Sequence, residues 1–170
     1  TFSNEFGFVR DCCLTNLDSR PIQTSMLDGL QNVLPFGIDS KFQSRFSNLA
    51  DAYKLSEMID GSRIGVFYLS SIPTDPAEPS EGLRATTVWQ DGLENIQVLL
   101  SDSQLNQFRR YRTVESEAVS RGRRGAYLVT SHFELAGSTE GFTPGPLAID
   151  RQPLPHQKNW LIVADVNRDQ

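Results

Sequence analysis

The stretch Gly125–Leu135, which runs GAYLVTSHFEL, carries the clearest structural signal in the chain. Side chains alternate along it, with Tyr127, Val129, Phe133 and Leu135 in one set and Leu128, Thr130, His132 and Glu134 in the other. Successive side chains of a β-strand point to opposite faces, so a period of two is typical of a strand. We therefore predict a strand over these residues.

Similar alternation recurs on both sides of this stretch. It predicts further strands at residues 6–15, 22–28, 64–70, 83–90, 96–100 and 159–166. Short strands joined by turns, without regular alternation of strand and helix, favour antiparallel sheets over a parallel one. The expected fold class is mainly β, an antiparallel β-sandwich with two helical insertions.

Two turns are indicated by their composition. Residues 16–21 (NLDSRP) contain Asn, Asp and Ser, which bond their own backbone, and Pro21, which fixes one dihedral angle. The strands on either side are therefore expected to pair as a β-hairpin over residues 6–28. The dipeptide Asp91-Gly92 predicts a second tight turn.

The helical insertions are expected at residues 40–60 and 103–120, where the alternation breaks. In the first, apolar residues recur at steps of four, three and four, with Asp39 or Ser40 as the N-cap. The second has an apolar side and an opposite side rich in arginine. Residues 27–35 also fit a short helical turn that Pro35 would stop. We expect these helices to plug or cover a sheet.

Two further segments are expected to be loops. Residues 73–79 carry three prolines, which favours a surface loop over a polyproline ligand. Residues 137–155 are rich in proline and glycine and are long for a plain connection. We expect this second loop to fold over a neighbouring domain or a ligand.

Composition limits the class of protein. The chain has 170 residues, of which 38% are hydrophobic and 22% charged, which indicates one globular β-sandwich domain over residues 1–170, or part of one. A net charge of −5 argues against nucleic acid as a partner, and no apolar stretch approaches the ~18 residues of a membrane span. Because the chain begins without Met and ends directly after an apolar run, we interpret it as excised from a larger multidomain protein.

Cys12 and Cys13 are adjacent, so in a strand their thiols point to opposite faces and cannot easily pair. We interpret them as small apolar strand residues; the alternative is a reactive or metal-binding thiol. Unpaired thiols and the lack of an Asn-x-Ser/Thr sequon favour a reducing, cytoplasmic location. With two cysteines and two histidines, we expect no metal site and no cofactor.

The sequence offers no complete catalytic constellation. His132 lies in the strongest predicted strand and His156 in the proline-rich loop, and no Gly-x-Ser-x-Gly elbow occurs. Glu115 and Glu117 are two positions apart on a predicted helix, so they splay rather than converge as glycosidase carboxylates do. We therefore assign no catalytic residue.

A basic cluster is the strongest charge feature, and it consists of Arg109, Arg110, Arg112, Arg121, Arg123 and Arg124. We interpret it as a solvated face or a patch paired with acidic neighbours, and the alternative is an anion or nucleic-acid site. The glycine-flanked residues 122–125 precede a strand rather than a helix, so they do not form a phosphate cradle. Trp89 and Trp160 lie in predicted strands, where core packing is favoured over sugar contact, so no carbohydrate-binding residue is named.

Three segments together resemble one family. Residues 11–21 (DCCLTNLDSRP) resemble the strand, Leu-Thr-Asn, turn and strand of the supersandwich, a galactose-mutarotase-like domain of cellobiose-phosphorylase-type bacterial enzymes. Residues 27–35 (LDGLQNVLP) resemble the segment after that hairpin, and residues 160–167 (WLIVADVN) resemble the late strand that leads towards the partner domain.

The resemblance implies a parent protein that is a glycoside hydrolase or phosphorylase. In that family the catalytic acid belongs to a helical toroid, so no catalytic residue is carried onto this chain. The implied function is a non-catalytic domain that supports the sugar site of a neighbouring catalytic domain of the same polypeptide, with an oligosaccharide as a further partner. The alternative is a stand-alone interaction or structural sandwich that binds a protein.

Overall fold

A computed structural model describes residues 2–3, 7–70, 84–137 and 156–167. Its helices are α1 Ser40–Arg45, α2 Ser47–Tyr53 and α3 Leu105–Tyr111. Its strands are β1 Phe2–Ser3, β2 Gly7–Thr15, β3 Ile22–Val33, β4 Lys54–Met58, β5 Gly65–Leu69, β6 Arg84–Asp91, β7 Gln97–Leu99, β8 Val119–Arg121, β9 Gly125–Leu135 and β10 His156–Asn167.

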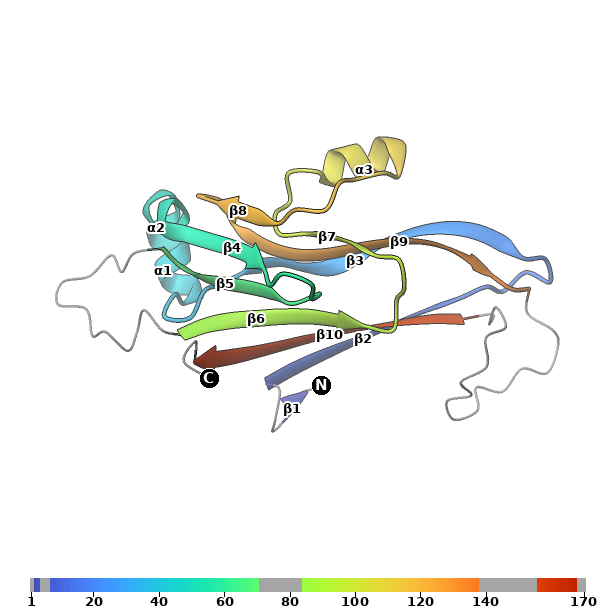
Figure 1. Ribbon diagram of the computed structural model, residues 1–170, viewed down its shortest axis with the longest axis horizontal. Helices are drawn as coiled ribbons and strands as arrows, with labels where there is room; N and C mark the ends of the chain where they lie inside the picture. The colour runs from blue at the N-terminus through green and yellow to red at the C-terminus, as the bar shows by residue number, and fades with distance from the viewer. Residues whose placement is uncertain (1, 4–6, 71–83, 138–155, 168–170) are drawn as a thin grey trace.

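The strands form two antiparallel sheets (Figure 1). Sheet A has the order β1-β2-β10-β6-β5-β4-β8, and sheet B has the order β3-β9-β7. Every pairing is antiparallel. The predicted mainly β, antiparallel sandwich is therefore confirmed.

Two strand pairs are nested in the sequence, because the pair β3–β9 lies between the two strands of the pair β2–β10. β2 pairs with β10 in sheet A, and β3 pairs with β9 in sheet B. The chain thus changes sheet between β2 and β3 and again between β9 and β10, as in double-sheet jelly rolls. The predicted hairpin over residues 6–28 is wrong, because the turn at 16–21 carries the chain from one sheet to the other instead of pairing its flanking strands. The chain likewise bends at Asp91-Gly92, between β6 of sheet A and β7 of sheet B.

The main core lies between the two sheets. Sheet A supplies Phe67 and Val88, and sheet B supplies Val98, Tyr127 and Val129, all of them buried. The alternation along β9 therefore places Tyr127 and Val129 in this core, as its period of two predicts. Tyr127 is also fixed by its hydroxyl, which donates to the carbonyl oxygen of Arg63 at 2.5 Å.

A second core lies on the outer face of sheet B. Leu99 of β7 and Leu128 of β9 pack there with Phe108 of α3 and with Val114, which follows the helix. α3 therefore covers part of this face, in line with the expectation that helices cover a sheet (Figure 1). Because β9 contributes to both cores, it is buried on both faces over residues 125–131.

The helical predictions were too long. Asp39 caps α1 as expected, since its side chain accepts from the backbone N–H of Phe42 at 2.6 Å. The predicted helix is interrupted at Phe46, between α1 and α2, and the chain enters β4 after Tyr53. In the second predicted segment, α3 ends at Tyr111, and its C-cap residue Arg112 has a φ of 59°. The chain then turns back to form β8. Apolar stripes at helical spacing favoured helix in both segments, but strand pairing takes over at residues 54–58 in the first and from residue 119 in the second.

The predicted helical turn at residues 27–35 is also wrong, because β3 continues through these residues to Val33. Pairing with β9 runs from Ile22 to Val33, with an irregularity between Gln31 and Val33. Asn32 adopts a φ of 56° at this irregularity. Asn tolerates this left-handed conformation better than most residues, so the strand can bulge without ending.

The α1–α2 pair is anchored to sheet A by a buried lysine. The side chain of Lys54, at the start of β4, is 1% exposed. Its Nζ donates to Gln43 Oε1 and, at 2.9 Å, to Asp51 Oδ1, while Asp51 Oδ2 lies 3.5 Å from Arg124 Nε. Burial raises the pKa of Asp51, but hydrogen bonds from Lys54 and Gln43 and the charges of Lys54 and Arg124 outweigh it, so the pKa lies below its ordinary value.

Gly29→Ala should destabilise the sandwich more than an ordinary glycine substitution does. A Cβ at Gly29 would lie 2.1 Å from the carbonyl oxygen of Tyr127, and φ is +157°, so we expect a loss of about 2–4 kcal/mol in the free energy of unfolding in urea. Gly61→Ala is the matched control, since φ is +71° but no atom lies within 4 Å of the added Cβ, and it should cost about 1–2 kcal/mol. Equal losses in the two variants would contradict the steric explanation.

Asp51→Asn should remove a pH-dependent part of the stability. The lowered pKa of Asp51 means that its contribution is present above the ordinary carboxyl pKa of 3.8 and is lost as the pH falls below it. At pH 7 the variant should be less stable by about 1–3 kcal/mol, and the difference should shrink towards pH 2. Urea unfolding across this pH range measures the difference in the free energy of unfolding. Asp60→Asn, at an exposed turn, is the control, and its stability should match that of the wild type at each pH. A difference independent of pH would refute the assignment.

Candidate functional site

The histidine of the strongest strand contacts a serine. His132 Nδ1 lies 2.7 Å from Ser25 Oγ, and next to it Gln23 Nε2 donates to Glu134 Oε2 at 2.6 Å. Both contacts join residues directly opposite each other in the β3–β9 register. In the described part of the chain no third side chain orients His132, as a serine nucleophile and its base require. We therefore interpret these contacts as cross-strand pairs on a solvent-facing surface.

Glu115 and Glu117 do not lie on a helix, contrary to the sequence prediction, but in the segment between α3 and β8. The carboxylate of Glu117 accepts from the backbone N–H of Leu100 at 2.9 Å and from the hydroxyls of Ser101 and Ser103 at 3.0 and 2.9 Å. These bonds tie the segment to the end of β7. Glu117 thus has a structural role, and the two carboxylates form no acid–base pair.

The two cysteines are free, as expected. Cys12 is partly buried beside Asp28 of β3, which also accepts from Arg10 Nη1 at 2.6 Å and so joins sheet B to sheet A. Burial and the negative charge of Asp28 raise the pKa of the Cys12 thiol, against the smaller opposing effect of Arg10. A raised pKa disfavours the nucleophilic thiolate, which supports the structural interpretation.

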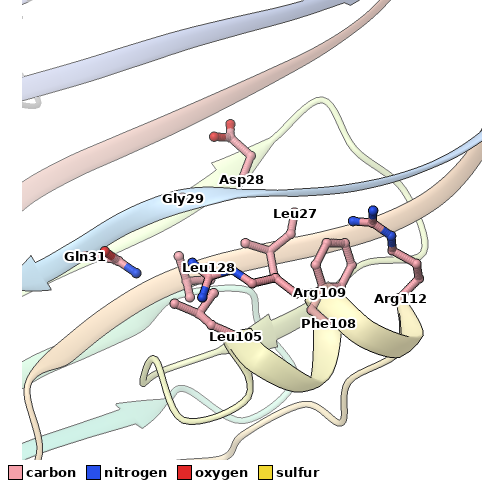
Figure 2. A pocket seen from close by; sticks show the side chains of 9 residues that line it. All are labelled: Leu27, Asp28, Gly29, Gln31, Leu105, Phe108, Arg109, Arg112 and Leu128. Atoms are coloured by element: carbon pink, nitrogen blue, oxygen red, sulfur yellow. The ribbon is translucent and has the colours of Figure 1, made fainter.

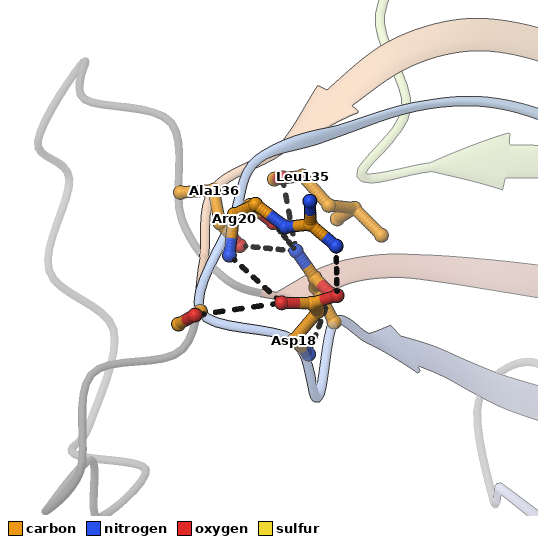
Figure 3. Close-up of polar contacts among 6 residues, drawn as sticks. Asp18, Arg20, Leu135 and Ala136 are labelled. Carbon is orange, nitrogen blue, oxygen red and sulfur yellow. Dashed lines mark hydrogen bonds and ion pairs between the residues drawn. The ribbon is translucent and has the colours of Figure 1, made fainter.

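The Leu-Thr-Asn segment of the family resemblance ends in a buried asparagine. Asn16, 3% exposed, donates from Nδ2 to the carbonyl oxygens of Arg20 and Ala136, each at 2.9 Å. Its Oδ1 accepts from the backbone N–H of Asp18, and Figure 3 shows the surrounding contacts. Hydrogen bonds from the backbone and side chain of Arg20 lower the pKa of Asp18. Asn16 therefore fastens the turn before β3 to the end of β9.

The six clustered arginines divide between two places. Arg109 and Arg110 lie on α3 with Arg112 at its C-cap, whereas Arg121 ends β8, and Arg123 and Arg124 lie in the turn before β9. Arg124 pairs with Asp51, which agrees with the expected pairing to acidic neighbours. In the described part of the chain, no carboxylate lies within ion-pair distance of Arg109, Arg110 or Arg112. All three are exposed.

A groove of about 490 Å³ lies beside these arginines, between α3 and β3 (Figure 2). Its walls are Leu27, Asp28, Gly29, Gln31, Leu105, Phe108, Arg109, Arg112 and Leu128. Phe108 and Leu128 give it an apolar floor, and Gln31 and Arg112 lie towards opposite ends. The Arg112 guanidinium lies 5.5 Å from the centre of the Phe108 ring. The groove therefore combines apolar surface with two cationic side chains and with the carboxylate of Asp28, which pairs with Arg10.

β3, which forms one wall of the groove, is an edge strand with 12 residues. The opposite edge of sheet B, at β7, is occupied by the segment that follows α3, because Val98 O accepts from the N–H of Glu117 at 2.9 Å and the N–H of Val98 donates to Ser116 Oγ at 3.3 Å. The edge strands of sheet A, β1 and β8, have 2 and 3 residues. Among the described residues, β3 alone is a long edge without a second partner strand.

The remaining expected positions contribute no further site. Trp89 lies in β6 and is partly buried, and Trp160 lies in β10, as predicted. His156 begins β10 opposite Thr15 and so is not part of the loop as predicted. Residues 73–79 fall outside the described residues, as do residues 138–155 of the second loop. The described residues hold no group of three or more His, Cys, Asp or Glu placed to bind a metal, and none of their helices is long and apolar enough to cross a membrane.

Sequence reasoning located the arginines but missed the groove. It assigned residues 27–35 to a helical turn, and this hid the fact that Leu27, Gly29 and Gln31 line one face of a strand. The alternation of these three positions was the available signal, since residues at i, i+2 and i+4 share a face.

No family model matches the chain, and a search of curated proteins found no match. The supersandwich resemblance, with its carbohydrate role and bacterial origin, therefore stays a prediction.

Proposed function

We propose that the chain is a non-catalytic β-sandwich module that binds a protein partner along the outer side of sheet B, at β3 and α3. The observation that carries the proposal is the 12-residue edge of β3 beside a groove. Long unpaired edges are a template for pairing with another chain, and proteins usually shorten or cover them. The other edges in the described part of the chain are short or occupied, so the open edge of β3 is the exception that a binding function explains.

The side of α3 that does not line the groove also carries side chains typical of interfaces. Tyr111 is 68% exposed, although large aromatic side chains are rarely left in water. Together with Asn106, Gln107 and Arg110 it lines a second hollow of about 470 Å³. Tyrosine and arginine are enriched among the residues that dominate binding energy at protein interfaces. The helix thus offers interface-type side chains on both of its sides.

The dispersal of reactive groups supports a non-catalytic role. His132 pairs with Ser25 on an exposed strand face, Glu117 is saturated with structural hydrogen bonds, and the pKa of Cys12 is raised. By analogy of fold, double-sheet jelly rolls include capsid and lectin domains, which work by assembly or binding.

The carbohydrate setting expected from the sequence is one form of this proposal. In that form the partner surface belongs to a neighbouring catalytic domain of the same polypeptide, and the sandwich supports the sugar site without contributing a catalytic residue. In the other form the partner is a separate protein. Both forms predict binding at the same face.

Selection of displayed random 12-residue peptides on the chain should enrich reproducible binders. When a selected peptide is bound, amide hydrogen exchange should slow in residues 22–33 and 105–112 and remain unchanged in β5 and β6, which serve as the internal control. Failure to enrich any binder, or protection confined to sheet A, would overturn the proposal.

The chain should release no product from a panel of oligosaccharides, with or without inorganic phosphate. Chromatography of the reaction products measures this, and a glycoside hydrolase and a phosphorylase serve as positive controls. Turnover that persists after repeated purification would show that the module is catalytic.

A further inference from the structure

The outer edge of β3, which has no partner strand among the described residues, and the arginines of α3 belong to one surface, and together they restrict what the surface can hold. This inference rests on the proposed function and specifies its partner. We propose that the groove receives an extended, acidic segment of a partner protein, which adds a strand to sheet B at β3 and places carboxylates on Arg109 and Arg112.

Strand addition follows from how the two edges of sheet B differ. The β7 edge already gives Val98 O to Glu117 and the N–H of Val98 to Ser116, so it has no room for a further strand there. The β3 edge is longer, and over residues 24–30 its side chains are buried or only partly exposed. An extended peptide beside β3 satisfies the outward backbone groups, as in other complexes that extend a sheet.

The positive charge of Arg109 and Arg112 favours an acidic segment as the occupant of the groove. Arg109 Nη1 donates to Asn106 Oδ1 at 3.0 Å, and Arg112 stacks on Phe108, so both guanidinium groups are held at the groove while neither meets a carboxylate among the described residues. Arg109 and Arg112 give the groove two positive charges, whereas the carboxylate of Asp28, which also lines it, is paired with Arg10. Basic or neutral segments would leave this local charge uncompensated, whereas a carboxylate pairs with it.

The spacing of the two arginines suits a strand. Residues three apart on a helix have Cβ atoms about 5–6 Å apart, and residues i and i+2 of a strand are about 6.6 Å apart on one face. Two acidic residues at alternate positions therefore reach Arg109 and Arg112 separately. The side chains between them point away from α3, so we expect them to be apolar.

The defining experiment uses fluorescein-labelled peptides and fluorescence anisotropy. The probe has the sequence Val-Glu-Val-Glu-Val-Glu, and its control has Lys in place of Glu. We expect saturable binding of the Glu probe that weakens as salt rises, and no binding of the Lys probe at 1 mM peptide. Absence of Glu-probe binding at that concentration, or equal binding of both probes, would overturn the inference.

Two sets of variants separate its parts. Arg109→Glu with Arg112→Glu should weaken binding of the Glu probe by about tenfold and allow the Lys probe to bind. Arg121→Glu with Arg123→Glu, which changes the charge by the same amount at the end of β8 and the turn after it, should have a smaller effect. Two probes N-methylated at alternate amides test strand pairing, because one set of amides faces β3 and the other faces solvent. One methylated probe should lose binding and the other should retain it; equal behaviour would exclude strand addition.

Failure here is distinguishable from failure of the proposed function. If displayed peptides protect residues 22–33 but the Glu probe does not bind, the module binds proteins and its acidic specificity is wrong. Tighter binding of a twelve-nucleotide oligo(dT) than of the Glu probe, lost in Arg109→Glu with Arg112→Glu, would instead reassign the arginines to nucleic acid.

Discussion

The burial of β9 on both faces is the constraint on which the rest of the structure depends. Tyr127 and Val129 point into the space between the sheets, while Ala126 and Leu128 point outward. A strand with apolar side chains on both faces needs cover on both sides. Sheet A supplies one cover and α3 the other, so the position of the helix follows from the composition of the strand on which it packs.

The outer cover is incomplete, and this creates the groove. α3 spans 7 residues, whereas β3 and β9 span 12 and 11. At about 1.5 Å per helical residue the helix reaches only about 10 Å along strands that are roughly 36–40 Å long. The rest of the outer face beyond the groove is therefore polar, with Ser25, His132 and Glu134 exposed to solvent or nearly so. The division of the face into a covered part, a groove and a polar part is a consequence of unequal element lengths.

The sequence was most informative where the side-chain pattern was local. Alternation located β9 at its observed bounds and predicted β2, β5, β6 and β7 within about one residue at most ends, and Asp39 was recognised as a cap. Prediction from the local pattern failed where pairing between strands distant in the sequence decides the secondary structure. β4 and β8 were assigned to helices because Tyr53 and Val114 continue helical stripes, and the hairpin was wrong because the partners of β2 and β3 lie about 90 to 155 residues away in the sequence. The groove was missed for the same reason, since its two walls come from segments about 80 residues apart.

The nested pairing of β2 with β10 has a consequence for how the chain reaches its native state. β10 completes sheet A by inserting between β2 and β6, so β2 can pair with β10 only after about 150 further residues have been synthesised. Contacts of such high sequence separation make folding slow, and until they form, β6 presents an open edge to other chains. Newly made chains are thus most vulnerable to aggregation in the interval before β10 arrives, and a truncation before residue 156 would make that interval permanent.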